Sequence, residues 1–121
     1  MEKPQNNSSY FYISPVGTPR KAVWQDNTDD KMSLKFFNVF ETQKECEREI
    51  ERIKAHRELL SLCDWKGGLH WHIGYDEFED EFFPQRFETV FSPYKFAKKD
   101  SVIEAIEFMG FDRLKLIFRI D

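Results

Sequence analysis

The three histidines and two cysteines of this 121-residue chain are the first residues to test for metal or nucleophile chemistry. His70 and His72 stand two positions apart, and two imidazoles at that spacing on a strand can chelate one ion. A structural zinc needs four such ligands, so His56 and Cys63 would have to complete the set. Nothing in the sequence brings them to that strand. We therefore expect no metal site, and a partly exposed sheet face at the two histidines.

A cysteine nucleophile would have to be Cys46 or Cys63, paired with one of the histidines. Cys46 falls in the first turn of a predicted helix, where a thiol pKa can be lowered, but no oxyanion loop accompanies it. The sequence also lacks a glycine-rich phosphate loop and the H-E-x-x-H, G-x-S-x-G and C-x-x-C motifs. We expect a protein that is not an enzyme, with no catalytic residues and no cofactor.

The segment 76–83 is the most unusual part of the sequence, because five carboxylates surround three phenylalanines. One interpretation is a solvated hairpin loop whose phenylalanines pack onto the domain. The other is a partner-binding epitope, in which the carboxylates steer toward a basic surface and the phenylalanines anchor after docking. An acidic surface of this kind could also imitate nucleic-acid phosphates. The candidate site residues are Asp76, Glu77, Phe78, Glu79, Asp80, Glu81, Phe82 and Phe83.

Composition favours a protein partner over a nucleic acid. The formal net charge is -4 and the pI about 5.4, whereas a phosphate-binding surface needs clustered Lys and Arg. The chain nevertheless has 13 Phe, 4 Tyr and 3 Trp, so some aromatic side chains should lie at the surface. A single-stranded nucleic-acid or nucleotide binder stays open as the alternative. It would use the aromatic residues Tyr10, Tyr12, Trp24, Trp71 and Tyr75 and the basic residues Lys95, Lys98 and Lys99.

Cysteine usage and hydropathy indicate the compartment. The two cysteines fall on one predicted helix about 25 Å apart at the standard rise per residue, so they cannot form a bridge. No apolar run approaches the ~18 residues that span a membrane, and the N-terminus has no signal-peptide core. We expect a cytoplasmic protein without a membrane partner.

The first half of the chain predicts a hairpin followed by a long helix. Residues 1–8 are polar and should be a flexible tail. Strands are predicted at 9–14 and 21–25 around a Pro- and Gly-rich turn. A loop follows at 26–33, whose latter half has the character of a helical turn.

A capping box of Thr42 and Glu45 opens a predicted helix over 43–63. The periodicity gives this helix one buried stripe, and a second apolar side in its C-terminal half. Two apolar sides fit a sandwiched helix or a subunit contact, which leaves a homodimer open. The stripe is Cys46, Ile50, Ile53 and Leu60, and the second side is Ala55, Leu59 and Leu62.

The second half predicts another hairpin and a short C-terminal helical region. Strands are expected at 69–75 and 85–91, with the acidic segment at the end of the hairpin. A short helical piece should begin at Ser92–Pro93, and a helix over 101–109 should be capped at Asp100 or Ser101. Residues 111–118 are compatible with helix or strand, and we favour helix. The predicted fold is α+β, a single domain over residues 9–121. In it, two hairpins form one antiparallel sheet, packed by the long helix and the short C-terminal helix.

A series of short motifs over residues 9–118 resembles a group of small accessory proteins encoded by phages and prophages, mainly of Gram-positive hosts. The first motifs are Tyr10-Phe-Tyr-Ile13, Trp24-Gln-Asp-Asn27, Asp30-Lys31, Asn38-Val-Phe-Glu-Thr42 with Glu45 and Glu47, and Arg52-x-Lys54. The last are Phe91-Ser-Pro93, Ala97, Ala105-Ile106 and Gly110-x-Asp112-Arg113-Leu114-Lys115. The chain departs from the group at Cys46, where the group usually has Ala, and in the acidic segment 76–83.

The resemblance implies a context and transfers no catalytic residue. A small phage protein of this kind acts inside a bacterial host, often stoichiometrically, and some inhibit host defence, as anti-CRISPR proteins do. It therefore leads us to expect a non-enzymatic binding protein that inhibits a host protein, such as a CRISPR-type or other anti-phage defence nuclease.

Overall fold

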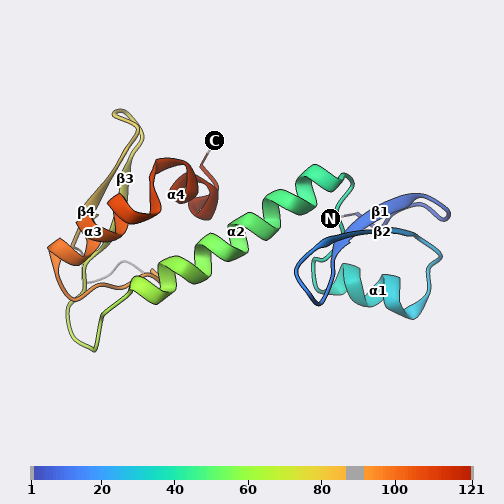
Figure 1. The fold of residues 1–121 in the computed structure, drawn as a ribbon, viewed down its shortest axis with the longest axis horizontal. Helices are drawn as coiled ribbons and strands as arrows, with labels where there is room; N and C mark the ends of the chain where they lie inside the picture. The colour runs from blue at the N-terminus through green and yellow to red at the C-terminus, as the bar shows by residue number, and fades with distance from the viewer. Residues whose placement is uncertain (1, 87–91, 121) are drawn as a thin grey trace. The chain divides into compact units, whose positions relative to one another are not determined.

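A computed structural model describes residues 2–86 and 92–120 of the chain. Within these ranges the elements follow in the order β1, β2, α1, α2, β3, β4, α3 and α4 (Figure 1). The predicted α+β class is confirmed, including the long helix and the short C-terminal helix. The chain divides into two compact units, residues 1–51 and 52–121, and the boundary falls inside α2. The expectation of a single domain over 9–121 stays a prediction.

The first unit is built on the hairpin of β1 (Ser9–Ile13) and β2 (Pro19–Val23), in which Ser9 pairs with Val23. The second strand was predicted at 21–25 and lies two residues earlier. The prediction treated Pro19 as part of the turn, yet a proline is tolerated as the first residue of a strand because it removes no essential donor there.

Tyr10, Trp24 and Val39 form a cluster of buried residues in this unit. The rings of Tyr10 and Trp24 meet edge to face at 5.8 Å. The Tyr10 hydroxyl donates to the buried Asp30 carboxylate at 2.6 Å, which ties the hairpin to the next helix. Burial and this hydrogen bond together raise the pKa of Tyr10 far above its ordinary range.

That next helix is α1 (Thr28–Lys35). It confirms the helical turn predicted in the latter half of 26–33 and shows that the helix begins earlier than predicted. Its first turn is closed by a capping box between Asn27 and Asp30: the Asp30 amide donates to Asn27 Oδ1 at 2.9 Å, and the Asp30 carboxylate accepts from the Asn27 amide. The pattern escaped sequence reasoning because Asp stands where the usual box has Glu or Gln.

Helix α2 (Gln43–Leu62) begins where the sequence predicts, and the Glu45 amide donates to Thr42 Oγ1 at 3.2 Å. The predicted single stripe is wrong in its second half, because Leu60 is 40% exposed. The physical reason is that each half of the helix belongs to a different unit and buries its own side. The buried residues are Cys46 and Ile50 in the first half and Ala55 and Leu59 in the second.

The second unit contains β3 (His72–Asp76), β4 (Glu81–Gln85), α3 (Lys99–Met109) and α4 (Phe111–Phe118). The predicted strand 85–91 is corrected to β4, four residues earlier, and residues 87–91 lie outside the described residues. The core of this unit includes Ala55, Leu59, Ile73, Tyr94, Phe96, Val102, Ala105, Met109, Leu114 and Ile117.

The described residues 92–98 contain no helix, which corrects the short helical piece expected at Ser92–Pro93. Phe96 is fully buried and forms an antiparallel bridge with Trp71. Helix α3 starts at Lys99, so its N-cap is Lys98 and not Asp100 or Ser101 as predicted, and no side chain caps it. The Ser101 hydroxyl donates to Asp64 at 2.7 Å. Helix α4 covers the residues for which helix was favoured over strand.

The two hairpins form two separate two-stranded sheets, which corrects the prediction of one antiparallel sheet. Phe11 of β1 forms an isolated bridge with Phe40, and Trp71, the residue before β3, forms one with Phe96. Each bridge joins residues that are distant in sequence but belong to the same unit. The sequence showed two hairpins but could not show these bridges.

The N-terminal residues make specific contacts with the first unit. The Asn7 amide donates to the Trp24 carbonyl at 2.8 Å, and Lys3 pairs with Asp26 at 2.9 Å. The flexibility of residues 1–8 stays a prediction. Over the described residues, no helix has both the length and the apolar character to cross a membrane.

Candidate functional site

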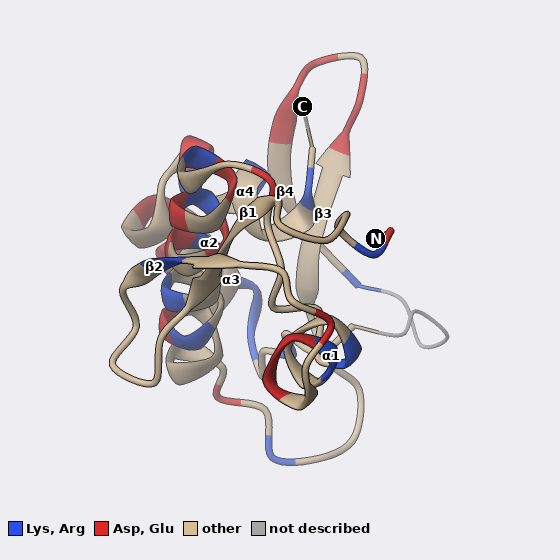
Figure 2. Cartoon of the chain, turned by 90° about the vertical axis from the view of Figure 1, so that its right-hand side faces the viewer, with Lys and Arg blue, Asp and Glu red and all other residues tan. Residues whose placement is uncertain are grey.

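The acidic segment 76–83 forms the end of the β3–β4 hairpin. Its two strands close on the pair Asp76 and Glu81, so the connecting turn has only the four residues 77–80. We call residues 76–81 the hairpin tip. Figure 2 shows the acidic residues gathered at this end of the hairpin. The segment was predicted as a longer loop over 76–84, and the difference arises from the position of β4.

Side-chain hydrogen bonds hold the turn of the hairpin tip in one conformation. Oδ1 of Asp76 accepts from the amides of Phe78 at 2.9 Å and Glu79 at 3.2 Å. Such a bond from an aspartate to the backbone two residues on stabilises tight turns. Asp80 closes the turn with φ at 52°, a left-handed conformation that Asp tolerates better than most residues.

Tyr75 and Lys115 fix the far end of the turn. The Tyr75 hydroxyl donates to Oδ1 of Asp80, and Lys115 of α4 approaches the same oxygen at 3.7 Å. The hydrogen bond to the Asp80 carboxylate raises the pKa of Tyr75 to about 12. Asp80 is exposed but partly neutralised within the molecule. The tip also exposes the carboxylates of Glu77, Glu79 and Glu81.

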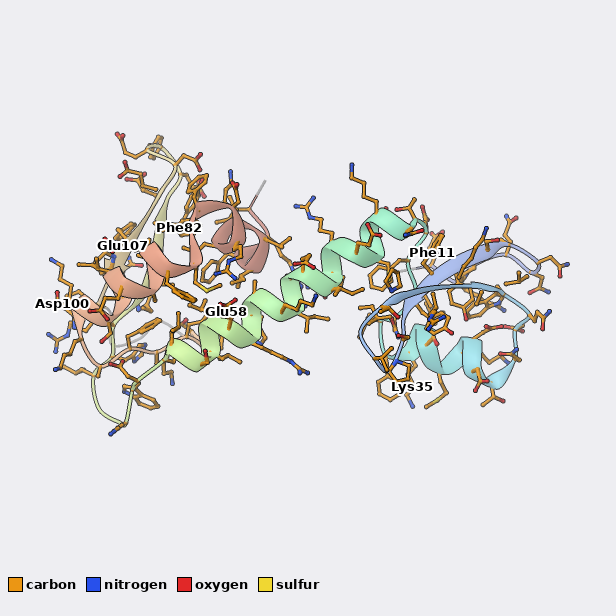
Figure 3. All side chains as sticks on the ribbon, in the orientation of Figure 1. Phe11, Lys35, Glu58, Phe82, Asp100 and Glu107 are labelled. Carbon is orange, nitrogen blue, oxygen red and sulfur yellow. The ribbon has the colours of Figure 1, made fainter. Side chains whose placement is uncertain are left out.

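The three phenylalanines of the segment have different surroundings. Phe82 packs into the core, with ring centroids 5.1 Å from Tyr75, 5.7 Å from Phe111 and 6.0 Å from Phe118 (Figure 3). Phe78 is 98% exposed in the middle of the turn. Adjacent strand residues point to opposite faces, so Phe83 lies on the other side of the hairpin from Phe82 and is 36% exposed.

Gly74 makes room for the Phe83 ring. These two residues pair across the strands, and a Cβ at Gly74 would stand 2.7 Å from Cζ of Phe83. The ring therefore lies over the bare backbone of β3. Between the hairpin face and the tip is a shallow hollow of about 340 Å³, lined by Tyr75, Asp76, Glu77, Phe78 and Phe83. The tip and the adjoining Phe83 thus combine one exposed aromatic ring, a second half-covered ring and four exposed carboxylates.

The histidines at the base of this hairpin are buried, which corrects the expectation of a partly exposed face. His70 is 9% exposed and His72 is 3% exposed, with ring centroids 5.8 Å apart. Nε2 of His72 lies 3.1 Å from Gln85, and burial lowers the pKa of His72. Nε2 of His70 is buried and has no hydrogen-bond partner among the described residues.

The other residues considered for metal or nucleophile chemistry lie elsewhere. His56 hydrogen-bonds Tyr94 through Nδ1, and the Cys63 thiol lies 3.5 Å from the Leu59 carbonyl. Burial raises the pKa of Cys63, and it also raises the pKa of Cys46, against the lowering that a first helical turn can produce. Over residues 2–86 and 92–120, no three His, Cys, Asp or Glu side chains come together as metal ligands would.

The proposed stacking aromatics do not form one exposed surface. Trp24 is fully buried and Tyr10 nearly so, both in the first unit, while Trp71 packs against the core of the second. Among the basic residues, Nζ of Lys95 lies 4.4 Å from the ring centroid of Trp65, which is 37% exposed. Lys98 and Lys99 are exposed at the start of α3.

Sequence reasoning missed a second exposed apolar surface, at the end of α1. Met32, Phe36 and Phe37 are 45%, 67% and 80% exposed, and we call these three residues the α1 patch. The signal was present in the sequence, because two adjacent phenylalanines after a polar helix cannot both face one small core.

Comparison of the chain with protein-family models, with curated proteins and with solved structures found no match. The functional argument therefore rests on the residues of the chain itself and on the motif resemblance described above.

Proposed function

We propose that the chain is a non-enzymatic binding protein whose hairpin tip docks on a basic surface of a partner protein. The observation that carries the proposal is Phe78, an almost fully exposed aromatic side chain held in a fixed turn between carboxylates. A mobile loop would lose conformational entropy on binding, whereas this turn is already ordered by Asp76 and by Tyr75 with Asp80.

The magnitude of the expected contribution follows from the exposure. Burying a phenylalanine side chain in an apolar pocket is worth roughly 1.5–3 kcal/mol, about a 10- to 150-fold change in affinity. The exposed carboxylates Glu77, Glu79 and Glu81 add long-range attraction to a positive surface and should act mainly on the association rate. Binding hot spots are typically large side chains that become fully desolvated near the centre of an interface, surrounded by contacts that exclude water.

The resemblance to phage accessory proteins supports a host protein as the partner, met in the cytoplasm of the bacterial host cell. Nucleic-acid-guided defence nucleases, including CRISPR-type effectors, bind their nucleic acids in positively charged channels. An acidic tip with an aromatic ring could occupy such a channel. Its carboxylates would take the place of the phosphates, and the Phe78 ring would take the place of a base. We therefore propose inhibition by occupation, with no chemical step.

The experiment is an affinity capture from host lysate in nuclease-treated and untreated arms, using the tagged full chain. The proposal expects a protein that is retained after nuclease treatment by the wild-type chain and lost by Phe78→Ser. The matched control is Val16→Ser, because Val16 is 78% exposed at the turn of the other hairpin. A captured nuclease should also be inhibited by the wild-type chain and not by Phe78→Ser. Equal capture by both variants would contradict the assignment to the tip.

A single-stranded nucleic-acid binder is the second candidate, favoured by the stack of Lys95 on Trp65 beside the exposed Lys98 and Lys99. It predicts affinity that falls steeply with salt, because each phosphate contact releases counterions. Salt-dependent binding of an unlabelled oligonucleotide, lost in Trp65→Ala and kept in Phe78→Ser, would replace the protein-partner proposal.

A further inference from the structure

The end of α1 holds a phenylalanine in a backbone conformation that favours glycine. The Phe37 amide donates to the Leu34 carbonyl at 3.0 Å, and the Asn38 amide to the Ser33 carbonyl at 2.7 Å. These two bonds define the helix-ending motif whose left-handed position is usually a glycine. Phe37 occupies that position with φ at 59°.

The segment after Phe37 is firmly held, so its conformation is fixed by the fold. Oδ1 of Asn38 accepts from the Ile13 amide at 2.7 Å, and Nδ2 donates to the Ile13 carbonyl at 2.9 Å. Asn38 thereby pairs with the end of β1 as a neighbouring strand residue would. Phe37 is consequently presented outward from an ordered backbone.

Neither packing nor backbone geometry explains an aromatic residue at position 37. Its side chain is 80% exposed, and Phe36 beside it is 67% exposed. Strained residues that make few contacts of their own tend to cluster at functional positions. Adjacent exposed aromatic side chains also form the kind of apolar patch that marks an interaction surface.

The size and charge of the α1 patch restrict what can cover it. From typical ring areas, its three side chains expose on the order of 300–400 Å², well below the ~800 Å² per partner of a stable interface. A contact of that size is typical of weak, transient association. Two α1 patches facing each other would also bring two positive charges together, whereas an element that carries carboxylates would be attracted. Lys35 is exposed directly beside Phe36 and is labelled in Figure 3. The matching element is an aromatic ring flanked by carboxylates.

We propose that the α1 patch of one copy of this chain binds the hairpin tip of a second copy. The tip has the required chemistry, since Phe78 can pack on Phe36 and Phe37 while Glu77 or Glu79 pairs with Lys35. The two surfaces differ, so the contact is head-to-tail and joins copies into a ring or an open chain. The tip is the same one that the proposed function uses, but self-association does not depend on a host partner. It would cover the tip until a partner that binds more tightly displaces the second copy.

Two single variants and their mixture test this contact. Phe78→Ser removes the aromatic ring of the tip. Phe37→Gly removes one ring of the α1 patch, and glycine readily adopts the left-handed conformation of position 37. Sedimentation of the full chain at rising concentration should show association for the wild type and for Val16→Ser, and monomers for each of the two variants alone. Their equimolar mixture should form dimers and nothing larger, because one intact tip then meets one intact patch. The association should weaken as salt is raised.

Several results would overturn the proposal. A wild-type chain that stays monomeric to millimolar concentration has no such contact. Association that survives Phe37→Gly, or a mixture of the variants that stays monomeric, also excludes it. Association lost in Phe37→Gly but kept in Phe78→Ser would indicate contact between two α1 patches instead.

Binding of the captured host protein separates this proposal from the proposed function. Phe37→Gly should keep that binding, whereas Phe78→Ser should lose it. Loss of host-protein binding in Phe37→Gly without any self-association of the wild type would assign the α1 patch to the host protein and overturn the inference drawn here. If the wild type stays monomeric and host-protein binding is lost only in Phe78→Ser, the proposed function is supported and the self-association is excluded.

Discussion

Replacing Phe37 tests the structural basis of the α1 patch through stability. A left-handed conformation costs an L-residue roughly 1–2 kcal/mol, and Phe37 has φ at 59°. Glycine relieves that cost but loses about 0.5–1 kcal/mol more chain entropy on folding than alanine does. Phe37→Gly and Phe37→Ala both remove a side chain that is 80% exposed, so their difference isolates the backbone. We expect Phe37→Gly to be more stable than Phe37→Ala by about 0.5–1 kcal/mol.

The assay is urea denaturation of the two variants and the wild type under identical conditions, with free energies taken from linear extrapolation. Equal slopes are required, since a changed slope would indicate a changed unfolded or native state. Phe37→Gly should also match or exceed the wild type, because the ring makes little contact. Phe37→Ala at least as stable as Phe37→Gly would refute the left-handed conformation, and with it the argument that this position holds an aromatic ring for binding.

Three further predictions concern the second hairpin. Phe82→Ala should lower the free energy of unfolding by about 3 kcal/mol, near the low end for a buried Phe because this ring is only partly buried. Phe78→Ala should change the free energy of unfolding by less than ~0.5 kcal/mol. Similar losses for the two variants in thermal or chemical denaturation would contradict the burial of Phe82 and the exposure of Phe78. Gly74→Ala should displace the Phe83 ring and destabilise the hairpin by about 1 kcal/mol, because the new Cβ would stand 2.7 Å from Cζ of Phe83; unchanged amide exchange in β3 and β4 would show that the ring is not there. Burial lowers the pKa of His72 below 6.5, so the unfolded chain takes up this proton at a higher pH than the folded chain does. The stability that His72 contributes is therefore present above pH 6.5 and lost as the pH falls through the folded value; melting temperatures across that range should fall more for the wild type than for His72→Gln, and parallel curves would exclude the effect.

Local signals account for the parts of the fold that the sequence predicts well. The cap at Thr42 placed the start of α2, and the run after Gly110 gave α4 over residues 111–118. Both depend on side chains within one or two turns, so no tertiary information was needed. Helix α1 was predicted only as a helical turn in the latter half of 26–33, and its start was missed because its capping box uses Asp30 instead of Glu.

Strand pairing is the part that the sequence could not settle. Pro84 and the carboxylates before it are typical of a turn, yet Pro84 belongs to β4 and pairs with Ile73 of β3. A proline is acceptable on an edge strand. Which edge a strand occupies depends on distant residues, such as the bridge of Trp71 with Phe96.

The same limit applies to the candidate site. The sequence identified the acidic, Phe-rich segment, but not which rings are exposed, because that depends on where β4 begins. Phe82 and Phe83 are neighbours, and strand alternation sends one ring into the core and the other outward. The left-handed backbone conformation of Phe37 is likewise not indicated by any pattern in the sequence.

The most direct test of the hairpin tip as a binding site is the affinity of the captured host protein for three forms of the chain. Calorimetric titration would compare the wild type, Phe78→Ser and Val16→Ser after denaturation curves have shown all three to be equally folded. The proposed function predicts a dissociation constant at least ~10-fold higher for Phe78→Ser, and unchanged for Val16→Ser. An unchanged constant for Phe78→Ser would contradict binding through the tip.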